Sequence, residues 1–324
     1  MSFLLHGLLY GAVVGSVLLT VTAWAVWFER KFSARMQSRL GPTIVGPVGL
    51  LQPIADALKL MQKETIFPDN ADRFLFRAAP PFMVVFSLAT AAVVPFGPDM
   101  IAADLDIGVL YILALAGLML FPVWIGGWAS NNKFALLAAM RGIAQGVSYE
   151  LPLVLSALVP VVLAGSMSLS VIVSFQAEHG WFIVWPPGPG LIAFGIFFVA
   201  SLAETNRIPF DIPEAESELV AGVTTEYTGM KFGFFYLAEY LHTLVSSAVA
   251  AALFFGGWHG PWVSGLHWFV LKTLVLFVSI FWIRWTLVRF RADQLMRLCW
   301  KWLVPISLVV LMAAAVAVQL GEGR

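Results

Sequence analysis

Eight long apolar segments constrain this chain more than any other feature of its sequence. They lie near residues 3–28, 79–97, 107–129, 134–164, 189–206, 232–256, 266–287 and 301–320. About 20 apolar residues cross a bilayer as a helix. The alternation of polar and apolar residues over about ten positions, typical of a membrane barrel, is missing. With 60% hydrophobic and 12% charged residues, the chain is predicted to be an all-α polytopic integral membrane protein. We expect eight transmembrane helices in a single membrane domain, 1–324.

Charge and cysteine content exclude several functions. The formal net charge is zero, so nothing favours nucleic acid as a partner. One cysteine, Cys299, excludes an intramolecular disulfide, a cysteine-ligated iron–sulfur cluster and a cysteine-rich zinc site. No two of the five histidines stand three or four residues apart, as paired ligands on one helix would. We expect no metal site and no redox centre in this chain.

Lysine and arginine alternate between rich and poor connections. The long connection after the first segment holds eight of them and the next holds none, and the connection after the seventh segment is again rich. Basic connections stay in the cytoplasm, so both termini are predicted to lie outside, with the first segment as an uncleaved anchor. The fifth connection, about 204–231, then faces the cytoplasm.

That fifth connection is strongly acidic. Six of the 19 acidic residues fall between Glu204 and Glu226, against only Arg207 and Lys231 nearby. Acids beside membrane spans are costly unless they pair, contact water or carry protons. We therefore look for function in this segment.

The sequence leaves more than one role open for individual acids of this segment. Asp211, Pro213 and Glu214 have the pattern of a helix start with a capping box, so Asp211 and Glu214 could be capping residues only. Glu204 ends an apolar span. It could form an ion pair with Arg207 or accept protons at the membrane edge.

Two further acids lie deep in apolar segments. Glu150 follows Arg141 by nine residues, about 13 Å along a helix, and Gly146 and Pro152 around it indicate a kink. Glu239 lies eight residues beyond Lys231. Each could be a buried acid paired with Lys272 or a tyrosine, but intramembrane acids favour a proton-carrying function.

Two motifs at the cytoplasmic side also have alternative interpretations. Residues 49–63 predict an amphipathic helix, which could lie on the membrane surface or dock on the protein's own spans. The basic residues Arg284, Arg289 and Arg291 are interpreted as the positive-inside anchor of the seventh span.

Several motifs occur in an order that resembles one family. They are Glu29-Arg-Lys31, Arg39-Leu-Gly-Pro42, Gly46-Pro-Val-Gly-Leu-Leu-Gln-Pro-Ile-Ala-Asp56, Arg141-Gly-Ile-Ala-Gln-Gly-Val-Ser-Tyr-Glu150, Ala203-Glu-Thr-Asn-Arg-Ile-Pro-Phe-Asp211, the acidic run Glu214 to Gly222, Glu226-Tyr227 and Ala238-Glu-Tyr240. The pattern is similar to the H subunit of bacterial respiratory complex I, counterpart of mitochondrial NADH dehydrogenase subunit 1. Thr43 and Val288 depart from the family's usual asparagine and proline.

The resemblance implies a membrane-arm subunit of the proton-pumping translocase NADH:quinone oxidoreductase, in the bacterial inner membrane with both termini periplasmic. It implies eight spans and partners among the other complex I subunits and membrane lipid. A quinone, expected to be ubiquinone, would be the substrate, and partner subunits would hold FMN and the iron–sulfur clusters. Residues implied to border the quinone chamber are Glu29, Arg30, Asp56, Arg207, Asp211 and Glu214. Those implied for a proton path are Glu204, Glu216, Glu226, Glu150 and Glu239, with Lys272 as a nearby cation.

Two other functions compete with this interpretation. The related membrane subunit of energy-converting hydrogenases, such as formate hydrogenlyase, shares the core motifs but does not handle quinone; the segment 127–133 and the full acidic loop favour complex I. A stand-alone proton or ion transporter should show inverted repeats, and none is evident.

Overall fold

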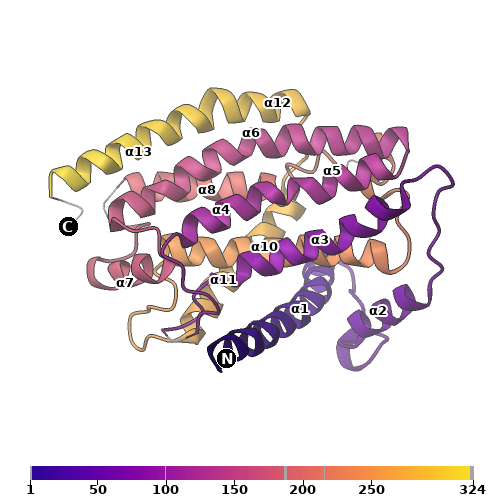
Figure 1. Ribbon diagram of the computed structural model, residues 1–324, viewed down its shortest axis with the longest axis horizontal. Coiled ribbons are helices and arrows are strands. Elements are labelled where there is room, and N and C mark those ends of the chain that lie inside the picture. The colour runs from indigo at the N-terminus through magenta and orange to yellow at the C-terminus, as the bar shows by residue number, and fades with distance from the viewer. Residues whose placement is uncertain (1, 99, 186–187, 215, 322–324) are drawn as a thin grey trace.

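The chain folds into a bundle of long helices that run roughly side by side (Figure 1). The structure, a computed structural model, describes residues 2–98, 100–185, 188–214 and 216–321. In these ranges the regular structure is helical, and strand pairing is limited to an isolated bridge between Gly97 and Met100. The predicted all-α membrane fold is confirmed.

Seven helical segments in the described ranges are long and apolar enough to cross a membrane. They are α1 (Ser2–Met36), α3 (Arg73–Ala91), α4 with α5 (Gly108–Leu118 and Leu120–Ala129), α6 (Lys133–Ala164), α10 (Met230–Phe254), α11 (Leu266–Thr286) and α12 with α13 (Ala292–Leu298 and Val304–Gln319). A π-helical turn, Cys299–Leu303, joins the last pair. The eighth predicted span is α8 (Pro189–Glu204), an apolar helix of 16 residues.

Helix α10 forms the centre of the bundle. It contacts α1, α3, α8 and α11, and most of its apolar stretch is buried. Small residues such as Ser246, Ser247 and Ala250–Ala252 line it, and small side chains let helices approach closely in a membrane. Polar side chains on α10 are therefore held among other helices.

Side-chain caps explain where two helices begin. Asp72 accepts hydrogen bonds from the backbone N–H groups of Phe74 and Leu75, at 3.0 and 3.2 Å, so α3 begins six residues before the predicted position 79. Asn132 caps α6 through the N–H of Phe134 at 2.8 Å. Helix α6 continues through both Pro152 and Pro160.

Two shorter helices lie at opposite ends of the bundle (Figure 1). Helix α2 (Gln52–Gln62) is the predicted amphipathic helix, preceded by a 3₁₀ turn at Pro47–Gly49. Helix α7 (Leu169–His179) was not predicted; it occupies the connection between α6 and α8.

The acidic connection is mostly irregular. It contains only the short α9 (Glu216–Leu219) and a 3₁₀ turn at Gly222–Thr224. No helix begins at Asp211 or Glu214, so the predicted capping box is wrong. Gly222 has φ +61° and a Cβ there would lie 2.1 Å from the carbonyl oxygen of Pro213, which shows how tightly this connection folds back on itself.

Candidate functional site

A charged junction joins α1, α10, α11 and the connection after α8; we define it as Glu29, Arg207, Tyr240 and Arg284. One carboxylate oxygen of the buried Glu29 accepts a hydrogen bond from Arg284 at 2.6 Å, and the other accepts one from the Tyr240 hydroxyl. The guanidinium carbon of Arg207 lies 4.2 Å from the centre of the Tyr240 ring, within the range of a cation–π contact. Arg284 is therefore more than a membrane anchor.

Arg207 is almost fully buried, at 4% exposure. Burial disfavours its charge, but Tyr240 and the carboxylates of Glu29, Glu239 and Glu214 outweigh burial and raise the Arg207 pKa above its ordinary value. Within the described ranges, its Nε and one Nη atom have no hydrogen-bond partner. Buried polar atoms usually have one, so these two donors of Arg207 are unsatisfied within the chain.

Asp211 forms a second ion pair beside the junction. Its Oδ2 lies 2.6 Å from Arg289 of the α11–α12 connection, so Arg289 also is more than a membrane anchor. Burial, with Glu214 nearby, outweighs the Arg289 charge and raises the Asp211 pKa to about 6. This group therefore titrates in a range where an ordinary aspartate stays charged.

An ion pair links the polar face of helix α2 to the bundle. Arg30 on α1 pairs with Asp56 of α2 at 2.6 Å. Within α2, Gln52 donates to the other oxygen of Asp56 at 3.0 Å. On the apolar face, Leu58 and Met61 are 54% and 66% exposed. The apolar face thus does not dock on this chain's own spans, which favours the membrane surface among the two alternatives.

Glu150 and Glu204 line one small cavity of about 10 Å³ between α4, α6 and α8. Gly117 of α4 makes this arrangement possible. A Cβ at position 117 would lie 2.6 Å from Oε1 of Glu150. The close approach leaves the Glu150 carboxylate facing the same cavity as Glu204.

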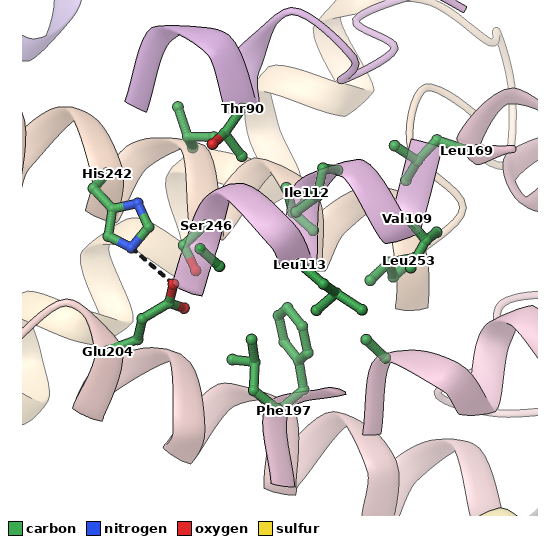
Figure 2. A pocket seen from close by; sticks show the side chains of 15 residues that line it. Thr90, Val109, Ile112, Leu113, Leu169, Phe197, Glu204, His242, Ser246 and Leu253 are labelled. Atoms are coloured by element: carbon green, nitrogen blue, oxygen red, sulfur yellow. Dashed lines mark ion pairs between the residues drawn. The ribbon is translucent and has the colours of Figure 1, made fainter. Parts of the chain in front are cut away.

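Glu204 also lines a second cavity, of about 30 Å³, with His242 of α10 (Figure 2). Its Oε1 lies 3.3 Å from Nε2 of His242. Glu204 pairs with this histidine and not with Arg207, whose cation lies over Tyr240. Of the two alternatives for Glu204, the ion pair with Arg207 is therefore not formed.

A second carboxylate pair lies in a separate cavity beside α10. Glu214 and Glu239 line a cavity of about 20 Å³ together with Asn206 and Phe235. Glu239 is adjacent in sequence to Tyr240 of the charged junction. The carboxylate pair and the junction therefore share one segment of α10.

Three other predicted residues lie apart from these groups. Glu226 accepts a hydrogen bond from Asn132 at 2.6 Å and lines an open cleft near the α5–α6 turn. Glu216 begins α9, but its side chain lies outside the described part of the structure. Lys272 donates to the backbone carbonyls of Phe255, Gly257 and His259 at the far end of α10. Those carbonyls take the place of the expected carboxylate partner.

The structure adds residues that sequence reasoning missed: Gly117, Tyr240, His242 and Arg289. Each of them contacts a residue far away in sequence. Tyr240 and its partner Glu29, for example, are 211 residues apart. The only available signal was a polar residue, His242, inside an apolar run.

Comparisons with known proteins give one consistent result. The model of the NADH dehydrogenase family matches residues 10–315. The chain is 48% identical over 307 residues to the first H subunit of NADH-quinone oxidoreductase of Geobacter metallireducens, covering 92% of each chain. It is 47% identical over 308 residues to the H subunit of NADH-quinone oxidoreductase of Dehalococcoides mccartyi, covering 95% of this chain and 84% of the relative. It is 46% identical over 319 residues to the same subunit of Thermomicrobium roseum, covering 93% of this chain and 92% of the relative.

Proposed function

The chain belongs to the NADH dehydrogenase family, and on that premise we propose that it acts as the H subunit of a proton-pumping NADH:quinone oxidoreductase. Its charged residues would form two connected parts, a quinone chamber and a proton path. The other complex I subunits would supply electrons through FMN and iron–sulfur clusters. The names of the relatives favour this function over a hydrogenase subunit or a stand-alone transporter.

The quinone chamber would lie between α1, α2 and the start of the acidic connection. Its border would be formed by Glu29, Arg30, Asp56, Arg207, Asp211 and Glu214. Two features support this assignment: the unpaired donors of Arg207 and the outward apolar face of α2. A quinone has an isoprenoid tail for the apolar surface and two carbonyl oxygens that accept hydrogen bonds.

The proton path would consist of Glu214, Glu239, Glu204 and Glu150, with Glu216 and Glu226 nearer the cytoplasmic surface. The observation that carries this proposal is that the four acids line small cavities two by two. Charged acids are costly inside a membrane, whereas acids that exchange protons through confined water are a recurrent device of proton carriers. Lys272 lies away from these acids, and we leave it outside the path.

The two parts would be coupled where they meet. Glu239 and Tyr240 are consecutive on α10, and the Tyr240 ring contacts Arg207. A change of charge in the chamber during quinone reduction would therefore alter the electrostatic field at the Glu239–Glu214 pair, because Arg207 and Tyr240, where the parts meet, are buried and charges there are poorly screened.

Replacing Glu150 or Glu239 by glutamine in the assembled complex tests the proton path. Glutamine keeps shape and hydrogen bonding but cannot exchange protons. We expect each variant to lower NADH:quinone reduction and proton pumping together by about tenfold or more, while NADH oxidation by ferricyanide persists. Glu178→Gln, an exposed acid on α7, is the matched control. Full pumping by both variants would refute the path.

A further inference from the structure

The two carboxylate pairs lie in different cavities, so a proton must cross from one pair to the other. Glu214 and Glu239 line the cavity beside Asn206 and Phe235, whereas Glu204 and Glu150 line the cavity beside Gly117. Direct transfer needs donor and acceptor within hydrogen-bond reach. A group located between the pairs would complete the route.

His242 occupies that position. It lies three residues after Glu239 on α10, and side chains at this spacing are neighbours on a helix surface. Its Nε2 is 3.3 Å from Oε1 of Glu204 on α8, and only 6% of its side chain is exposed. His242 therefore contacts one pair and is one helical turn from the other.

The polar atoms around His242 are not satisfied by the described part of the protein. Both ring nitrogens and Oε1 of Glu204 lack a partner with hydrogen-bond geometry there. The cavity beside them, about 30 Å³, exceeds the minimum of about 10–15 Å³ for one water molecule. Figure 2 shows His242, Glu204 and Ser246 together at one end of it, and aliphatic side chains such as Leu113 and Val109 towards the other.

A purely structural role fits these contacts less well. Ser201 and Ser246 already form a hydrogen bond between α8 and α10, with their hydroxyl oxygens 2.6 Å apart. The other elements around the cavity, α3, α4, α6 and α7, add one hydroxyl, Thr90, and otherwise apolar side chains. Glu204 is thus the charged group that faces the imidazole from a neighbouring helix, and Glu239 the one on its own helix.

We propose that His242 carries protons between the Glu239–Glu214 pair and the Glu204–Glu150 pair. In the forward step the Nε2–H bond breaks and an O–H bond forms on Oε1 of Glu204, which turns imidazolium and carboxylate into neutral imidazole and carboxylic acid. A proton from the Glu239 side, passed directly or through water, then restores the imidazolium. The first step leaves the net charge of His242 and Glu204 together unchanged, so no uncompensated charge is created in this buried site. This inference rests on the proposed proton path.

The test is His242→Gln in the assembled complex in proteoliposomes, with Glu204→Gln as reference and His179→Gln on α7 as the histidine control. We expect His242→Gln to reduce coupled quinone reduction and pumping at least about fivefold, with ferricyanide reduction retained. His179→Gln should keep the wild-type rate of both.

The outcomes separate this inference from the proposed function. If Glu204→Gln is impaired but His242→Gln pumps normally, the inference fails and the path stands. If Glu204→Gln itself pumps fully, the path fails. Should His242→Gln not assemble, His242→Asn is measured in the same way. Failure of both to assemble would indicate a structural imidazole and overturn the inference.

Discussion

At the scale of single residues, the site depends on how closely side chains approach one another. Gly117 is the clearest case, because it makes room for the Glu150 carboxylate. A methyl group at this position meets the flexible end of a side chain and not the backbone. The fold should therefore persist while the carboxylate moves.

We predict that Gly117→Ala assembles normally but lowers proton pumping several-fold, because the Glu150 carboxylate is displaced from the cavity that it shares with Glu204. Measuring pumping and ferricyanide reduction in the same membranes checks this. Gly11→Ala in α1, where a Cβ would have no neighbour within 4 Å, is the matched control. Wild-type pumping by Gly117→Ala would show that the position of this carboxylate is unimportant.

Asp211 gives a prediction on pH. Its pKa in the folded chain is about 6, above the value of about 3.9 for an unfolded chain, so the folded form binds the proton more tightly. Raising the pH from about 4 to 6 should therefore remove stability contributed by this group, up to about 3 kcal/mol in total.

Asp211→Asn removes that titration. The measurement is thermal unfolding of both purified complexes between pH 5 and 7.5. The stability of wild type relative to Asp211→Asn should fall as the pH rises to about 6. Above about pH 7 the difference between the two should be constant. A stability difference that is independent of pH would contradict the raised pKa of Asp211.

At the scale of helices, α2 is linked to α1 by an ion pair and presents its apolar face outward. We predict that Arg30→Ala, which removes the partner of Asp56, impairs quinone reduction several-fold and raises the apparent KM for quinone, while ferricyanide reduction persists. Kinetic titration with a water-soluble quinone analogue measures this. Arg35→Ala, in the last turn of α1, is the control. If both activities fall equally in an assembled complex, the role of Arg30 is not specific to quinone.

Helices were largely predictable from the sequence because each depends on a local property, a long apolar run. The ends of the helices were less predictable. Helix α3 begins before its apolar run because Asp72 caps it, and α8 ends at Glu204 after 16 residues. The contacts of the site were not predictable from local pattern. Glu204 meets His242, and Asp211 meets Arg289, because helices distant in sequence pack together.

At the scale of the whole molecule, alternating basic connections predict an orientation with both termini outside. The described helices are compatible with it, since α2 and the acidic connection lie at one end of the bundle and α7 lies at the other (Figure 1). Single cysteines in a Cys299→Ser background test this. Serine can keep the hydrogen bond that the Cys299 thiol donates to the Ser148 carbonyl, so the background should fold.

Ser264→Cys lies in the exposed connection between α10 and α11, and Lys133→Cys lies exposed at the start of α6. These sites fall on opposite sides of the predicted membrane, because one α-helical span separates each connection from the next. An impermeant maleimide added to intact cells should label Ser264→Cys and leave Lys133→Cys unlabelled. After permeabilisation and dissociation of the complex in detergent, both should react, which shows that Lys133→Cys is accessible in principle. Labelling of Lys133→Cys alone in intact cells would reverse the orientation, and the acidic connection would then face the wrong side to meet the electron-supplying subunits.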